Sequence, residues 1–453
     1  MKLEHVNEER FAKNLSRAIQ IATISHEDEA DTDWTKFKEF HDFLKEAYPK
    51  TFSTLDVEEV GRAGLILHWK GSDNTLDPIG FLAHQDVVPV APGTEEDWTN
   101  PPFSGANDGT FIWGRGALDM KSHLLCIIEG IETLLEEGYT TTRDVYVCLD
   151  YNEEIVAGKD NGAKKIATLL NERGIHFDSI LDEGGGSTEV HAKNILNAHI
   201  TMVGIAEKGY ADYEITVKGL GGHSSFPPKH TALGQLSELI TKIENHPFEA
   251  HFTTPVLAMF STIGNHMSSP LGGLLKHPGV LKPVLKNVMS KNPFTAAMVR
   301  TSTAVTMASA SPAPNVLPEA ATCVINFRLL QGDTLASVKK HLEVLAKDYD
   351  ATITLLKGKE ASAVSPTDTR SFHTIEDIFA DGCETSFTTP YLLTACTDSY
   401  HYECICENLY RFSPFSLPSE LMHTPHSTNE RFPVDQITPG VSFFMQYIRR
   451  MNA

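Results

Sequence analysis

Acidic and histidine side chains follow three segments that have the composition of buried strands. The first segment ends in HQD at 84–86, the second in NEE at 152–154 and the third in DEG at 182–184. The carboxyl ends of parallel strands meet at one edge of a sheet, where ligands bind, so these groups can converge although they are far apart in the chain. Asp119 comes just before an expected helix and lies between the first two segments, in a position to join them.

Each of these residues alone also has an ordinary structural explanation. Asp182 can form a turn, Asp119 can cap a helix, and Glu153 and Glu154 can be a solvated pair. Together, however, carboxylates brought close at neutral pH repel one another unless a cation neutralises them. Carboxylate and imidazole ligands suit zinc, cobalt or manganese, and the absence of cysteine among them argues against a structural zinc site. The pattern therefore favours a hydrolytic metal centre.

The elements that must position these residues alternate between helix and strand. Apolar residues recur at helical spacing over 7–24, 32–47, 120–137, 162–173 and 436–449. Strand-like segments cover 64–69, 79–83, 145–149 and 179–181. Repeated strand, helix and strand indicate an α/β layer with a mostly parallel sheet and right-handed crossovers.

The pattern changes from about Gly209 onward. Strands are expected at 211–218, 301–308, 320–329 and 351–356, and helices at 231–245 and 335–347. Their order is that of a ferredoxin-like α+β unit, and residues 246–300, with several Pro and Gly, look like an insertion within it. We therefore predict a discontinuous α/β catalytic domain over 1–207 and 363–453, interrupted by a smaller domain over 208–362.

Composition limits the class of protein further. The chain has 453 residues and a net charge of −21, which argues against a nucleic-acid partner. Its apolar runs fall far short of the ~20 residues that a membrane span needs, and its N-terminus does not have the pattern of a signal peptide. The seven cysteines are scattered and odd in number, so we expect them to be reduced. These features predict a cytoplasmic protein with no membrane partner.

A series of strings, in chain order, resembles the M20 metallopeptidase family. They are AHQDVVPV, WTNPPFSG, GRGALDMK, the pair EE at 153–154, LDEGG, GHSSFPP, NVLPEA, NFRLL and PHSTNE. The strings TDSYHY at 397–402 and NPFTAAMVRTSTAV at 292–305 look most like the branch of carboxypeptidase S and N-fatty-acyl-amino-acid hydrolases. The resemblance runs from about residue 10 to the C-terminus. It implies a zinc-peptidase catalytic domain whose inserted domain serves as a lid and a dimerisation surface.

The resemblance also implies two zinc ions, for which cobalt or manganese can substitute. One ion would be held by His84, Asp119 and Asp182. The other would be held by Asp119, Glu154 and His426, so that Asp119 bridges the two. His423 is the rival ligand, but His426 has the family's spacing to the Asn-Glu pair that follows it.

Two further roles near the metals follow from the resemblance. Glu153 would be the general base that takes a proton from a metal-bridging water. Asp86 would accept the imidazole N–H of His84 and fix its tautomer, although it can also be a simple turn residue.

Three residues of the inserted domain match family positions that contact substrate: His223, Asn315 and Arg328. His223 would stabilise the oxyanion, often from the partner subunit of a homodimer, and Arg328 can bind a carboxylate in a bidentate fork. A loop histidine and a solvent-facing strand arginine are the plain alternatives.

The implied reaction is hydrolysis of a peptide or N-acyl amide bond beside a C-terminal amino acid with a free carboxylate. Carboxypeptidase or dipeptidase activity and N-acyl-amino-acid hydrolysis both stay open, because the walls of the pocket decide between them. Ala395, Cys396 and Tyr400 stand where relatives in this branch commonly have Gly-Gly and Arg, which leaves the specificity open as well.

Overall fold

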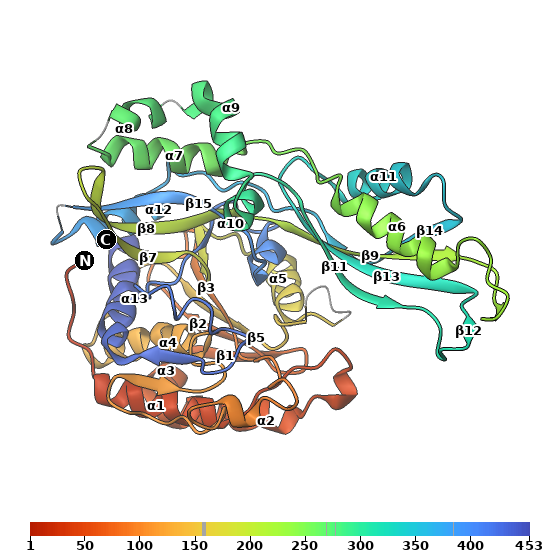
Figure 1. The fold of residues 1–453 in the computed structure, drawn as a ribbon. Coiled ribbons are helices and arrows are strands. Elements are labelled where there is room, and N and C mark those ends of the chain that lie inside the picture. The colour runs from red at the N-terminus through yellow and green to blue at the C-terminus, as the bar shows by residue number, and fades with distance from the viewer. Residues whose placement is uncertain (156–159, 269, 277, 384) are drawn as a thin grey trace.

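A computed structural model of the chain describes residues 1–155, 160–268, 270–276, 278–383 and 385–453. Figure 1 shows a larger unit built around a nine-stranded sheet and a smaller unit, with a four-stranded sheet, that extends from one side of it. Within the described residues, none of the helices is long and apolar enough to cross a membrane.

The large sheet has the order β1-β2-β5-β3-β6-β16-β8-β15, and β7 pairs with β8. Its strands are β1 (Asp56–Val60), β2 (Gly64–Trp69), β3 (Ile79–His84), β5 (Val145–Asp150), β6 (Ser179–Asp182), β7 (Gly186–Ala192), β8 (Leu196–Glu207), β15 (Ser386–Leu393) and β16 (Leu409–Arg411). The central strands β5, β3, β6 and β16 are parallel to one another, as predicted. Strands β1 and β2 are joined by only three residues, and a connection this short can link only antiparallel strands.

Helices cover both faces of this sheet. They are α1 (Glu8–Gln20), α2 (Trp34–Ala47), α3 (Pro49–Thr54), α4 (Lys121–Glu136), α5 (Gly162–Glu172), α12 (Arg370–Ala380) and α13 (Ile437–Met451). Leu65 and Leu67 of β2 face a core shared with α1, α4 and α13, whereas Ile66 faces α5. Every residue of β3 is consequently buried, as in a strand covered on both sides.

The smaller unit contains an antiparallel sheet of order β11-β13-β9-β14. Its strands are β9 (Gly209–Lys218), β11 (Ser302–Ser309), β13 (Ala320–Leu329) and β14 (Ala351–Lys359). Helices α6 (Ala232–Glu244) and α11 (Leu335–Ala346) pack on one face and form a separate hydrophobic core with it. The chain order of these elements is that of a ferredoxin-like unit.

The described part of residues 246–300 contains four helices: α7 (Thr254–His266), α8 (Pro270–Leu275), α9 (Pro278–Met289) and α10 (Pro293–Ala297). Val256 and Met259 of α7 share a core with Ala206 and Leu392 of the large sheet. This helical segment therefore lies over β8 and β15 and not on the small sheet, although the sequence places it inside the 208–362 insertion (Figure 1). Two short pairings complete the fold: β4 (Phe111–Trp113) with β17 (Arg431–Pro433), and β10 (Gly222–His223) with β12 (Val316–Leu317).

Candidate metal centre

Two imidazoles meet the two oxygens of one carboxylate at the carboxyl edge of the large sheet. His84, the last residue of β3, places Nε2 3.1 Å from Oδ1 of Asp119. His426 places Nε2 3.0 Å from Oδ2 of Asp119 and 3.0 Å from Oε2 of Glu154. Asp119 thus has the position of a bridging carboxylate. Of the two candidate histidines, His426 and His423, it is His426 that contacts Asp119 and Glu154.

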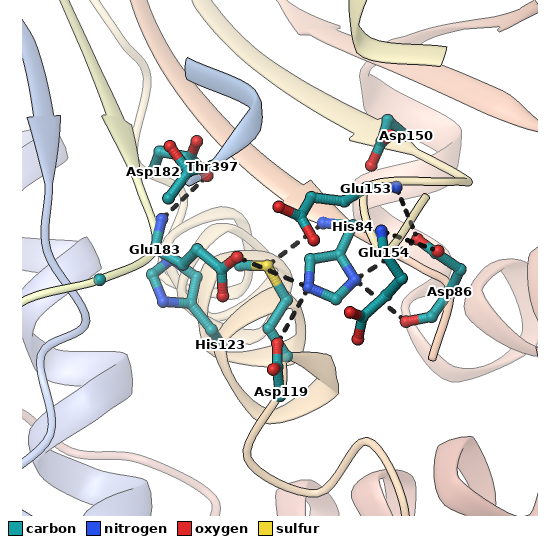
Figure 2. A network of polar contacts seen from close by, with 12 residues as sticks. His84, Asp86, Asp119, His123, Asp150, Glu153, Glu154, Asp182, Glu183 and Thr397 are labelled. Carbon is teal, nitrogen blue, oxygen red and sulfur yellow. Dashed lines mark hydrogen bonds and ion pairs between the residues drawn. The ribbon is translucent and has the colours of Figure 1, made fainter. Parts of the chain in front are cut away.

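Glu183, and not Asp182, directs its carboxylate toward this group (Figure 2). Glu183 Oε1 lies 3.6 Å from Nε2 of His84. The oxygens of Asp182 instead accept the backbone N–H groups of Glu183 and Ser399, each at 2.8 Å. Consecutive side chains at the end of a strand point to opposite sides, so only one of these two acids can face the site. The contacts therefore favour Glu183 as the ligand over Asp182, the residue expected from the sequence.

The donor atoms fit a divalent cation. Among the residues that the structure describes, two groups are compact enough to hold an ion, namely His84 with Asp119 and Glu154, and His84 with Glu153 and Glu183. Burial and then the neighbouring acids raise the pKa of Glu153 and of Glu183 well above the ordinary value. In addition, Oε1 of Glu154 is buried without a hydrogen-bond partner among the described residues. A buried oxygen of this kind is costly unless a cation or donor reaches it.

The histidines give the same indication. Hydrogen bonds to Asp119 and Glu154 raise the pKa of His426 to about 10. Burial opposes a charge on His84, but the surrounding carboxylates, Glu183 first among them, outweigh it and raise its pKa well above the ordinary value. In the absence of a metal ion, protons on these histidines and glutamates therefore offset the negative charge of the clustered carboxylates. A metal ion competes for the same positions and releases these protons when it binds.

Asp86 orders this site in a different way from the one expected. His84 Nδ1 lies 3.0 Å from the backbone oxygen of Asp86 and 3.4 Å from its carboxylate, so the main chain is the nearer partner of the imidazole. The buried carboxylate instead accepts the N–H groups of Glu153 at 3.2 Å and Glu154 at 3.3 Å, and the hydroxyl of Ser25 at 2.5 Å. Asp86 therefore fixes the turn that carries both glutamates.

Glu430 is a supporting residue that the sequence did not identify as part of the site. It is fully buried and accepts the N–H groups of Leu118 at 2.9 Å and Asp119 at 3.1 Å. Its other oxygen pairs with Arg115 at 2.7 Å. Glu430 thus holds the backbone of the bridging aspartate. Its place in the string PHSTNE, four residues after His426, was the available signal.

The loop that carries His426 is attached to the loop at residues 97–99. Asn429, which has a φ of 63°, accepts the N–H of Thr99 at 2.6 Å and donates to the carbonyl of Asp97 at 3.1 Å. His426 itself has a φ of 59°, an uncommon conformation for a residue with a side chain. This backbone geometry brings the imidazole from a late loop to a centre otherwise built from residues 84–183.

The three expected substrate contacts are distributed over the small unit. His223 and Asn315 lie around β10 and β12, at the end of the small sheet that is remote from the large sheet (Figure 1). Arg328 lies on β13, where Nη1 is 3.3 Å from Sγ of Cys396 and the guanidinium packs over the ring of Tyr210. The structure thus brings Arg328 to the junction of the two units and leaves the other two residues far from the metal group of the same chain.

The position that departs from the family pattern, Tyr400, lies at this junction as well. Its ring packs under Nζ of Lys359, 3.5 Å from the ring centroid. The pKa of Tyr400 is raised by burial and by nearby acids, among them Glu207 and Glu153. A neutral phenol and a lysine therefore lie together at the position where the resemblance led us to expect arginine.

Acids and imidazoles gathered at the carboxyl edge of an α/β sheet define a metal-dependent hydrolase. Residues 80–450 match the model of Peptidase family M20/M25/M40, and the chain belongs to this family.

Several curated relatives match nearly the whole chain. It is 33% identical to "Probable carboxypeptidase S-like 2" of Dictyostelium discoideum over 97% of this chain and 84% of that protein. It is 34% identical to an N-fatty-acyl-amino acid synthase/hydrolase of Mus musculus over 98% of this chain and 89% of that protein. Among solved structures, an M20 family metallo-carboxypeptidase from Sulfolobus solfataricus has the same fold, with a TM-score of 0.71 at 15% identity, over 98% of this chain and 99% of that one.

Proposed function

We propose that this enzyme uses two zinc ions to hydrolyse a peptide or N-acyl amide bond beside a C-terminal amino acid with a free carboxylate. The observation that carries the proposal is the pair of imidazoles on opposite oxygens of Asp119. His84, Asp119 and Glu183 would hold one ion, and Asp119, Glu154 and His426 the other. Zinc suits these nitrogen and oxygen donors, and cobalt or manganese can replace it.

Glu153 is the general base in this proposal. When bound, the two ions would polarise the scissile carbonyl and lower the pKa of the attacking water. The backbone N–H of Glu153 donates a hydrogen bond to the carboxylate of Asp86, which holds Glu153 at this site. The carboxylate of Glu153 could then take a proton from the water and return it to the leaving amine.

Glu153→Gln tests this role. The amide keeps the size of the side chain but cannot accept the proton, so zinc content should stay near two ions per chain while kcat falls by about 10²–10⁴-fold. Dialysis against a chelator should abolish the activity of the natural enzyme, and zinc should restore it. Turnover near the natural rate in Glu153→Gln would exclude this base, and undiminished turnover in metal-free protein would exclude the mechanism.

Arg328 is the proposed partner of the substrate carboxylate. Its stacking on Tyr210 orients the guanidinium, which suits bidentate recognition. The two curated relatives suggest two substrate classes, a peptide and an N-fatty-acyl amino acid. Rates on a blocked dipeptide and on a fatty-acyl amino acid, each compared with its carboxamide analogue, would separate the classes. Equal rates on acid and amide would reject the clamp.

We also propose that the smaller unit is a lid through which two chains pair. His223 and Asn315 lie too far from the metal group of their own chain to meet a substrate there, which supports a contribution to the partner's site. The edge strand β11 is largely exposed and contains no charged residue. Edge strands usually carry charges or proline that prevent pairing, so an uncharged edge favours association.

For the compartment we propose the cytoplasm, with no nucleic-acid partner. The seven cysteines are odd in number and scattered, which is the pattern expected in a reducing environment. The net charge of −21 disfavours contact with a phosphate backbone. Cell fractionation would test the location.

A further inference from the structure

The segment between Glu249 and Glu319 has the opposite charge from the rest of the chain. It contains no Asp or Glu, although the chain has 59 acidic residues and a net charge of −21. Its basic residues are Lys276, Lys282, Lys286, Lys291 and Arg300. Most of the segment is the helical layer α7 to α10 over the large sheet. The helices of this layer are therefore basic, although the protein as a whole is acidic.

The same layer exposes large apolar side chains. Leu274 of α8 is 53% exposed, Val284 and Val288 of α9 are 61% and 59% exposed, and Phe294 of α10 is 71% exposed. Val284 and Val288 are four residues apart and thus lie on one face of their helix. Exposed apolar residues are ordinary when they are scattered, but here each of three consecutive helices carries at least one, and lysines lie near them in the sequence.

These residues are presented on a fixed base. Leu275, Met289 and Met298, which follow or lie near the exposed side chains, are buried. Helix α7 packs against β15, and a Cβ on its Gly264 would meet the backbone of Leu275 at 2.7 Å, so α8 lies close against α7. Figure 1 shows α8 and α9 as the outermost layer, on the side of α7 away from the sheet.

We propose that α8, α9 and α10 dock this protein on the surface of an anionic lipid bilayer. Helices that combine lysines with exposed leucine, valine and phenylalanine bind at the boundary between headgroups and acyl chains. The charge of the whole molecule would repel such a surface, so a layer whose own helices carry no Asp or Glu is the one that can approach it. The short apolar runs and the N-terminus, on which the expected lack of a membrane partner rested, concern spans and leader peptides and not a surface of this kind.

Two contacts refine the proposal. Lys286 pairs with Glu249 at 2.8 Å, so Lys282 and Lys291, both exposed, are the better contacts for lipid headgroups. At the other end of the layer, Nζ of Lys208 donates to the carbonyls of Ala297 and Arg300, each at 2.9 Å.

The docking layer therefore ends at the junction between the two units. Lys208 follows directly on β8, and its carbonyl lies 3.5 Å from Sγ of Cys396, the neighbour of Arg328. A docked molecule would hold its substrate-binding junction close to the bilayer. Docking itself does not depend on the proposed reaction.

Co-sedimentation of the full-length protein with lipid vesicles tests the proposal. We expect binding to phosphatidylcholine vesicles that contain phosphatidylserine, weaker binding at high salt and little binding to phosphatidylcholine alone. The double variant Val284→Asp/Val288→Asp should bind at least about tenfold more weakly, because two apolar side chains no longer enter the interface. Lys282→Glu/Lys291→Glu should also weaken binding. Val344→Asp, at an equally exposed valine of the lysine-bearing helix α11, is the matched control and should bind normally.

Unchanged thermal unfolding would show that each variant is folded. If the valine double variant does not fold, the lysine double variant and the comparison of the two lipids still test the proposal. Failure of the natural protein to bind phosphatidylserine vesicles would overturn the proposal. So would equal binding to both lipids, or binding that neither double variant weakens. If the protein does not bind vesicles but forms dimers that the Val284→Asp/Val288→Asp variant loses, the layer is instead an interface with a second copy of the chain.

Discussion

Glu183 and Asp182 are adjacent acids whose carboxylates have different partners, and this difference gives a prediction. Glu183→Gln should lose about one metal ion per chain after dialysis, because it removes a charged ligand. Asp182→Asn should keep both ions, since its oxygens meet backbone N–H groups, and should lower the thermal midpoint of the loaded protein by a few degrees. Metal analysis of both variants decides the matter. The reverse result would return Asp182 to the ligand set.

The stability of the metal-free protein should fall as pH rises. The pKa values of Glu153 and Glu183 are raised from 4.5, and that of His426 is raised from 6.5 to about 10, so the folded state holds protons that the unfolded chain releases. Their stabilising contribution is complete below these ordinary values and is lost between about pH 4.5 and 10. Denaturant unfolding of chelated protein across this range measures the effect.

Glu183→Gln is the control for this pH dependence. Without one of the buried acids, the free energy of unfolding of the metal-free protein should decline less steeply with pH. Zinc should reverse the trend in the natural protein, because metal binding strengthens as protons leave the ligands. A metal-free protein whose stability rises from pH 5 to 9 would contradict the expected charge balance.

At the scale of residues, the sequence predicted well which segments form the site. It predicted less well which side chain of a segment faces the site. His84, Asp119, Glu154 and His426 follow from strand ends and motif spacing, and the structure brings them together. The choice between Asp182 and Glu183 depends on the orientation of β6, and the amide that holds Asp182 belongs to Ser399, 217 residues away. A local pattern contains no information about such a contact.

At the scale of elements, one carboxylate joins the two places where the chain passes between the large and the small unit, after β8 and after β14. Glu207 is the last residue of β8 and is completely buried. It pairs with Lys359 at the end of β14 and with Nε of Arg411 at 3.1 Å. It also accepts the N–H of Thr397 at 3.1 Å and the hydroxyl of Thr397 at 2.8 Å. The hydroxyl of Thr397 in turn lies 2.7 Å from that of Ser399, whose N–H holds Asp182.

Glu207→Gln should therefore be strongly destabilising. Removing one member of a buried charge cluster leaves Lys359 and Arg411 uncompensated, which costs about 3–5 kcal/mol of the free energy of unfolding. The double variant Glu207→Gln/Lys359→Met should recover part of this loss. Glu58→Gln, in the exposed pair of Glu58 with Arg173, is the matched control and should cost at most about 1 kcal/mol. Urea unfolding measures all three, and a loss as small as the control's would exclude the buried cluster as an important contribution.

The elements themselves were predictable where one periodicity dominates. The strand expected at 320–329 coincides with β13, and those expected at 64–69 and 79–83 coincide with β2 and nearly all of β3. The segment 246–300 was read only as an insertion because its Pro and Gly obscure helical spacing. Its packing against β15 joins residues more than a hundred positions apart, and no local signal specifies that contact.

At the scale of the whole molecule, the separation of His223 from the metal group matters most. His223 is exposed on β10, at the remote end of the small sheet, where it pairs in register with Val316 of β12. A residue that stabilises charge in the transition state must touch the reacting atoms. Within one chain this position leaves His223 without a catalytic role, whereas in a two-fold dimer each chain can supply the imidazole to the other.

Mixing two inactive variants tests this arrangement. Homodimers of Glu153→Gln lack the base in both sites, and homodimers of His223→Ala lack the imidazole in both. In a mixed dimer, the chain with His223→Ala keeps Glu153 and receives His223 from its partner, so one of the two sites is complete. Subunit exchange should therefore restore activity to roughly a quarter of the natural level, since half the dimers are mixed and each has one working site. If the mixture stays as inactive as its components although exchange is complete, His223 does not act across a dimer. If His223→Ala alone keeps full activity, the residue has no part in the reaction.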